Sequence, residues 1–129
     1  MTRILLVESE SQAGRGVAGT LRDDGFDVLD FRDGRDLFQR VRAALGTCDD
    51  ATPTAVVADV CSQTPCCRQM LHAVRDSDRP VPVILAAPPA DCDGRAAAYR
   101  LGADAVVDRP LDPDQVLAAL ELVLLHQAD

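Results

Sequence analysis

Five short apolar runs recur along the chain, and they restrict the fold more than any other feature. They cover Ile4–Val7, Phe26–Phe31, Ala55–Val60, Val81–Ala87 and Ala105–Val107. Runs of this length, rich in Val, Ile and Leu and bounded by turn residues, predict buried strands rather than helices. Strands that are buried on both faces belong in a parallel sheet covered by helices. In the run Phe26–Phe31, two Asp residues interrupt the apolar side chains, and this strand is expected near the sheet edge.

Segments with helical periodicity lie between these runs. They cover Ser11–Asp24, Leu37–Leu45, Cys67–Arg75, Arg95–Leu101 and a last helix opened by Asp112 and Pro113. Gly25, Gly46 and Gly102 follow three of them, as helix-terminating glycines do. Alternation of strand and helix predicts an α/β fold, with a doubly wound, five-stranded parallel sheet and right-handed crossovers.

Size and charge narrow the function. A chain of 129 residues with 47% apolar residues is expected to form a single domain over residues 1–129. The formal net charge of -8 argues against direct binding of nucleic acid by this domain. The chain has no apolar run of membrane-spanning length and no signal peptide, so a cytoplasmic protein is expected, without membrane contact. Lysine is absent, which excludes a G-x-x-x-x-G-K phosphate loop, and no nucleotide site is predicted.

Three segments together resemble the receiver domain of bacterial response regulators. They are the strand-like opening Ile4–Glu10 with its acidic end, the run Ala55–Asp59, and the stretch Leu101–Pro110, which begins Leu-Gly-Ala-Asp and ends Arg-Pro. The resemblance covers essentially the whole chain. It implies a flavodoxin-like three-layer sandwich and a signalling role in a two-component system rather than an enzyme.

The resemblance also implies a phosphorylation site. Asp59 matches the aspartate that accepts a phosphoryl group from a histidine kinase. The Mg²⁺ ligands of the family would correspond to Glu8, Asp59 and the carbonyl of Cys61. Ser9 stands where a second carboxylate is expected, which makes Mg²⁺ binding weak.

Three further positions depart from the family pattern. Arg109 replaces the lysine that contacts the phosphoryl oxygens, and its planar guanidinium differs in shape from an ammonium group. Ala87 lacks the switch hydroxyl, and Val106 replaces the switch aromatic. The interpretation is a degenerate, or pseudo-, receiver that acts mainly through protein–protein contacts. The alternative is a working phosphoacceptor with an altered readout.

The cysteines offer a hypothesis of a different class. Cys61, Cys66, Cys67 and Cys92 are expected in loops on the Asp59 side, where they could form a redox or metal sensor. Their spacing matches no zinc signature. His72 and His126 are expected on helices, facing solvent.

The last helix carries two apolar lines. Its predicted core stripe is Val116, Leu117, Leu120, Val123 and Leu124. Ala118, Leu122 and Leu125 form a second line on another face. The second line indicates either a broad core stripe or a contact surface, formed with the last strand, for a partner protein, a second copy or a downstream domain.

Overall fold

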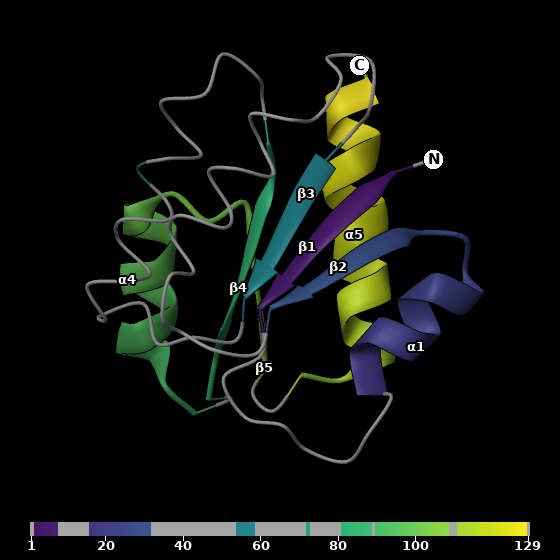
Figure 1. Cartoon of the computed structure of the whole chain (residues 1–129). Coiled ribbons are helices and arrows are strands. Elements are labelled where there is room, and N and C mark those ends of the chain that lie inside the picture. The colour runs from purple at the N-terminus through teal and green to yellow at the C-terminus, as the bar shows by residue number, and fades with distance from the viewer. Residues whose placement is uncertain are drawn as a thin grey trace.

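The computed structural model describes residues 2–7, 16–31, 54–58, 72, 81–88, 90–108 and 111–128. Within these ranges the strands β1 (Arg3–Val7), β2 (Asp27–Phe31), β3 (Thr54–Ala58), β4 (Val83–Ala87) and β5 (Ala105–Asp108) form one sheet (Figure 1). The strand order is β2-β1-β3-β4-β5, and every neighbouring pair is parallel. The predicted five-stranded parallel sheet is confirmed, with β2 at an edge.

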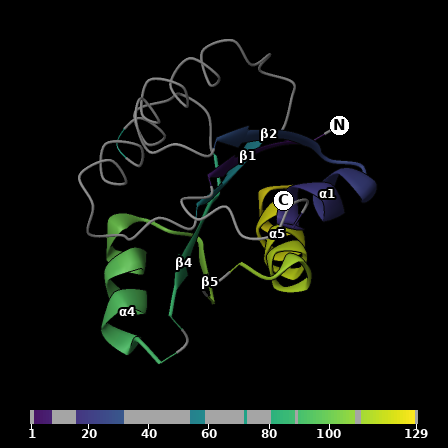
Figure 2. The same cartoon turned by 60° about the horizontal axis from the view of Figure 1, so that its bottom comes forward.

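Helices cover both faces of this sheet. The helices α1 (Gly16–Asp23) and α5 (Pro113–Ala128) lie together on one face, and α4 (Cys92–Leu101) lies on the other (Figure 2). This is the expected doubly wound, three-layer arrangement. None of the helices in the described ranges is both long and apolar enough to cross a membrane.

The main core lies between the sheet and the α1–α5 layer. Its fully buried members come from five elements and include Ile4, Leu6, Leu21, Val57, Ile84 and Leu120. The central strands are buried along their length, as the apolar runs predict: every residue of β4 is buried, and Ala55–Ala58 of β3 are fully buried. Two-sided burial explains why these strands lack the alternation of a half-exposed sheet.

Two glycines end helices as the sequence predicts. Gly25 and Gly102 adopt φ values of 100° and 114°, in the left-handed region that favours glycine. After α1, the Phe26 N–H donates to the Leu21 carbonyl at 3.1 Å. After α4, the Ala103 N–H donates to the Ala98 carbonyl at 3.1 Å. Both helices therefore stop with the same terminal hydrogen-bond pattern.

The start of α4 was predicted three residues too late. The helix begins at Cys92, because Asp91 caps it: the Asp91 carboxylate accepts a hydrogen bond from the Gly94 N–H at 2.8 Å. Of the helix predicted over 11–24, the described part is Gly16–Asp23. The helices predicted over 37–45 and, apart from His72, over 67–75 lie outside the described residues.

Asp104, the last residue of the Leu-Gly-Ala-Asp stretch, connects the start of β5 to β4 through two hydrogen bonds. Its backbone N–H donates to the Val83 carbonyl at 2.8 Å, and its carboxylate accepts a hydrogen bond from the Val83 N–H, also at 2.8 Å. This reciprocal pair precedes the ladder in which Ile84 lies opposite Ala105. Asp104 therefore sets where β5 begins relative to β4.

Replacing Asp104 by Ala should destabilise the protein by about 1–3 kcal/mol, because the buried Val83 N–H loses its acceptor. Urea unfolding measures this loss. The Asp104→Asn variant keeps a side-chain oxygen and should lose clearly less. Equal losses for the two variants would contradict the role of that acceptor.

Candidate functional site

The carboxyl ends of the central strands meet at one edge of the sheet. Val7, the last residue of β1, lies opposite Ala58, the last residue of β3. Ala87, the last residue of β4, lies opposite Asp108, the last residue of β5. Ligands of open parallel sheets bind at this edge. The register therefore places four strand ends where a site is expected.

Two candidate carboxylates are attached directly to these ends. Glu8 follows Val7 in the chain and Asp59 follows Ala58, and both lie outside the described residues. Adjacent strands lie about 4.8 Å apart, and consecutive Cα atoms about 3.8 Å apart. The attachment points of Glu8 and Asp59 are thus on neighbouring strands at matched positions. Ser9, Cys61 and Arg109 also lie outside the described residues.

The two switch positions lie on one face of the sheet. Ala87 and Leu85 are two residues apart on β4, and Val106 lies opposite Leu85, so all three share a face. The intervening Ala86 belongs to the core under α1 and α5, so the shared face is the one that α4 covers. Ala87 is buried and has only a methyl group, and Val106 is half-buried. This face therefore has neither a hydroxyl nor a ring at these positions.

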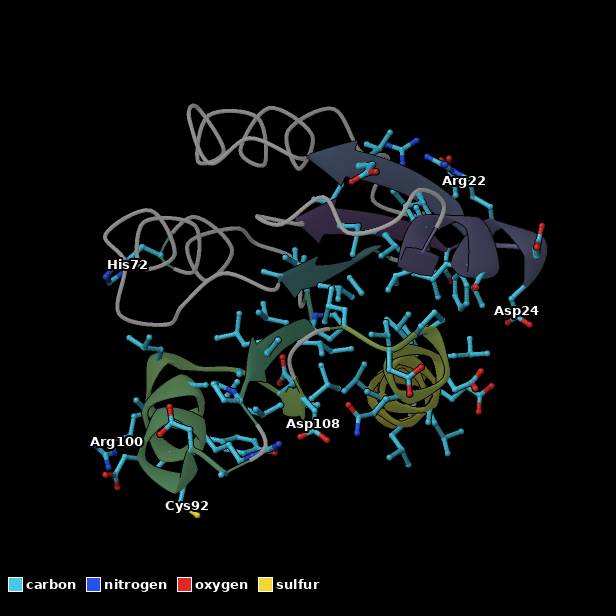
Figure 3. All side chains as sticks on the ribbon, turned by 90° about the horizontal axis from the view of Figure 1, so that it is seen from below. Arg22, Asp24, His72, Cys92, Arg100 and Asp108 are labelled. Carbon is cyan, nitrogen blue, oxygen red and sulfur yellow. The ribbon has the colours of Figure 1, made fainter. Side chains whose placement is uncertain are left out.

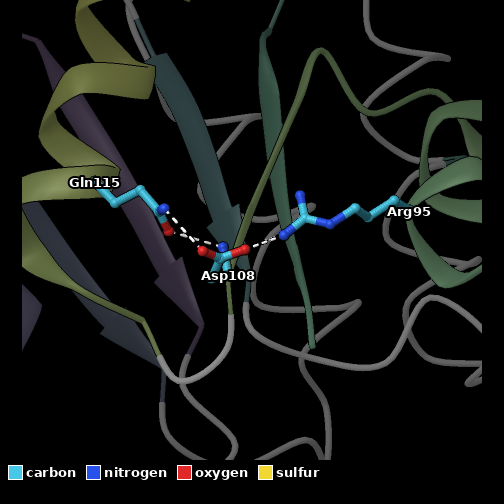
Figure 4. A network of polar contacts seen from close by, with 3 residues as sticks. All are labelled: Arg95, Asp108 and Gln115. Carbon is cyan, nitrogen blue, oxygen red and sulfur yellow. Dashed lines mark hydrogen bonds and ion pairs between the residues drawn. The ribbon is translucent and has the colours of Figure 1, made fainter. Parts of the chain in front are cut away.

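A polar network that sequence analysis did not predict surrounds Asp108 (Figure 4). Arg95 of α4 donates from Nη2 to one carboxylate oxygen of Asp108. Gln115 of α5 donates from Nε2 to the other at 3.0 Å, and its Oε1 accepts a hydrogen bond from the Asp108 N–H at 2.8 Å. The Asp108 side chain is 38% exposed. The sequence signal was an acidic residue directly before Arg109-Pro110.

Gln115 stands three residues after Asp112, the position of a capping-box glutamine, but it bonds elsewhere. A capping-box Gln reaches back to the N–H of the helix cap. Here the cap is Asp112, which accepts a hydrogen bond from the Asp114 N–H at 3.3 Å. Gln115 instead bonds to β5, because Asp108 offers it both a donor and an acceptor.

The second apolar line of α5 is exposed. Leu122 and Leu125 are 61% and 62% exposed, and Ala118 is also exposed. Val116 and Leu120, from the predicted core stripe, are fully buried. The explanation that the second line extends the core stripe is wrong, and α5 presents apolar side chains to solvent.

Among the candidate cysteines, Cys92 alone lies in the described ranges. It was expected in a loop, but it is the first residue of α4, with an exposed thiol on the outer side of that helix (Figure 3). Cys61, Cys66 and Cys67 lie outside the described residues. His72 is exposed, as expected. In the part of the chain that the structure describes, no group of three or more His, Cys, Asp or Glu side chains could hold a metal ion.

The sequence contains one glycine pattern that is typical of nucleotide-binding sites, although no nucleotide site was predicted. Residues Gly14–Gly19 spell G-x-G-x-x-G, the pattern of dinucleotide-binding turns. In that motif the first glycine makes the tight turn directly after the strand. Here β1 ends at Val7, seven residues before Gly14, and Gly16 already begins α1. The pattern therefore lacks the strand–turn–helix setting that dinucleotide binding needs.

Comparison with known proteins gives a consistent result. No family model matches the chain. The curated transcriptional regulatory protein PcoR of Escherichia coli is 27% identical over 124 residues, which are 96% of this chain and 52% of PcoR. The chain thus spans about half the length of the curated relative that it matches.

Solved receiver structures share the fold over nearly the whole chain. The receiver domain of the TMAO respiratory response regulator TorR superposes with a TM-score of 0.77, at 19% identity over 98% of both chains. The chemotaxis response regulator CheY4 of Vibrio cholerae gives a TM-score of 0.72, at 22% identity over 95% of this chain and 98% of CheY4. A response regulator receiver protein from Burkholderia phymatum gives 0.74, at 22% identity over 96% and 95%. The expected receiver fold is confirmed.

Proposed function

We propose that this chain, which has the fold of response-regulator receiver domains, is a cytoplasmic signalling domain that works mainly through protein–protein contacts. In this proposal phosphorylation of Asp59 is weak or absent, and the domain is not an enzyme. The observation that carries it is the face under α4, where buried Ala87 and half-buried Val106 have no group that could follow a phosphoryl group.

The Mg²⁺ site is part of the proposal. Glu8 and Asp59 follow matched strand ends and would provide hard carboxylate oxygens, and the Cys61 carbonyl would provide a third ligand. When bound, Mg²⁺ would neutralise charge that develops on a transferred phosphoryl group. Ser9 contributes no charge at the second acidic position, so these residues fit a weak site. Arg109 would supply the cationic contact in place of lysine.

The register of β1 and β3 favours one alternative. Val7 and Ala58 are paired, so Glu8 and Asp59 follow adjacent strand ends, as a phosphoacceptor site requires. In the alternative, a histidine kinase phosphorylates Asp59, and the signal leaves by a route that does not use Ala87 or Val106. The two functions differ in whether Asp59 accepts a phosphoryl group.

The exposed line on α5, with β5 beside it, is the proposed contact surface. A second copy of the chain is the occupant we propose, because an isologous contact lets one apolar patch meet its equivalent. PcoR is named a transcriptional regulatory protein and is about twice as long as this chain. A longer protein containing this domain would present the same surface next to its further domains.

Incubation with acetyl phosphate and Mg²⁺, followed by intact-mass measurement, tests the phosphorylation proposal. We expect little or no phosphoryl-sized gain in mass, because the Mg²⁺ ligands lack one carboxylate. The Asp59→Ala variant is the control. A stoichiometric gain that disappears in this variant would overturn the proposal in favour of a working phosphoacceptor.

Sedimentation velocity over a range of concentrations tests the contact surface. We expect a dimer whose Kd rises about tenfold or more in Leu122→Glu, since a charge would then replace an apolar contact. Leu29→Glu changes a leucine that is 36% exposed on β2, away from α5, and should leave the Kd unchanged. A monomer at all concentrations would exclude the second copy and leave a different protein as the partner.

A further inference from the structure

Asp108 connects two helices that lie on opposite faces of the sheet. It is the last residue of the edge strand β5, and its carboxylate contacts one side chain from each helix layer. Arg95 approaches it from α4 and Gln115 from α5, as Figure 4 shows. We propose that Asp108 is a positioning residue that clamps α4 and α5 to the end of β5 and keeps the α4–β5–α5 face in one arrangement. The clamp goes beyond the proposed function, because it does not depend on whether Asp59 accepts a phosphoryl group.

The chemistry of the network requires these residue types. Gln115 donates to the Asp108 carboxylate and at the same time accepts from the Asp108 N–H. An amide side chain can do both, whereas an ionised carboxylate only accepts. The second carboxylate oxygen of Asp108 remains for the Arg95 guanidinium. The Asp108 carboxylate thus accepts one hydrogen bond from each of Arg95 and Gln115, and the Gln115 oxygen accepts one from the Asp108 N–H.

Apolar packing alone holds α4 loosely. Among the ten residues of α4, Ala98 is the buried one. In contrast, α5 buries Val116, Ala119, Leu120 and Val123. A helix with so little buried surface depends more on its polar contacts for its position. The contact between Arg95 and Asp108 therefore matters most for α4.

The network is half-exposed, so its main effect is on position rather than on global stability. The Arg95 and Asp108 side chains are 29% and 38% exposed, and ion pairs of this exposure contribute little to folding. The two hydrogen bonds of Gln115 fix the orientation of its side-chain amide, because Asp108 bonds to both the oxygen and the nitrogen of that group. Local opening of α4 is therefore the quantity that the clamp controls.

Hydrogen exchange measured by mass spectrometry on the full chain tests the clamp. Gln115→Glu sets two carboxylates against each other, and Asp108→Asn leaves one side-chain oxygen for two donors, Gln115 and Arg95. Gln115→Glu should speed exchange at the start of α5, and Asp108→Asn should speed it both there and in residues 92–101, each by about fivefold, as the loss of one ordinary hydrogen bond implies. The double variant Asp108→Asn/Gln115→Glu restores donor to acceptor between positions 108 and 115, so exchange at the start of α5 should return to the wild-type rate. Residues 92–101 should recover only in part, because Arg95 then meets a neutral amide oxygen instead of a carboxylate.

A matched control uses the other edge of the sheet. Arg3 and Asp27 form an ion pair at 3.3 Å, with side chains 29% and 45% exposed. Asp27→Asn weakens this pair and should leave exchange in α4 unchanged. A glutamate near the start of a helix otherwise stabilises that helix through the helix dipole. The dipole effect alone therefore predicts slower exchange of α5 in the Gln115→Glu variant. The clamp predicts the opposite sign.

Three outcomes would overturn the clamp. The first is unchanged exchange in α4 and α5 of the single variants. The second is a double variant that exchanges as fast as the faster single variant, since a shared hydrogen-bond pair must show coupling. The third is equal acceleration in peptides from β1 and β2, which would mean a loss of global stability instead of a local release.

Discussion

The parallel register of the buried strands is the constraint on which the rest of the structure depends. Because β3 and β4 are buried on both faces, a slip of one residue would move every side chain of a strand to the opposite layer. The Asp104–Val83 pair fixes the relation of β4 to β5 before their ladder begins. Fixed register then aligns the strand ends at one edge, which is where the candidate site lies.

The parts of the fold that were predictable depend on local chain chemistry. Apolar runs located the five strands, and Gly25 and Gly102 located two helix ends, because left-handed backbone favours glycine. The capping of α4 by Asp91 was missed, since a single Asp in a polar segment gives a weak signal. The partnership of Asp108 with Arg95 and Gln115 was also missed, because it joins three elements that only the tertiary fold brings together.

The candidate site was predictable from sequence only as a set of positions. Asp59, Glu8 and Arg109 stay predictions, while Ala87 and Val106 can be placed on the face under α4. On α5, sequence periodicity separated the core stripe from the line of Ala118, Leu122 and Leu125. Periodicity could not tell whether that line was buried, because burial depends on what packs against the helix. The observed exposure turns the line into a candidate contact surface.

In our proposal, the α4–β5–α5 face of the domain is set by its own contacts rather than by a group bound at the strand ends. Amide chemical shifts, recorded by NMR with Mg²⁺ before and after addition of the phosphoryl analogue beryllium trifluoride, test this account most directly. We predict that α4, β5 and α5 keep their shifts, because Ala87 and Val106 cannot relay a change and Asp108 holds both helices. Shift changes that extend over α4, β5 and α5, and that disappear in Asp59→Ala, would contradict it.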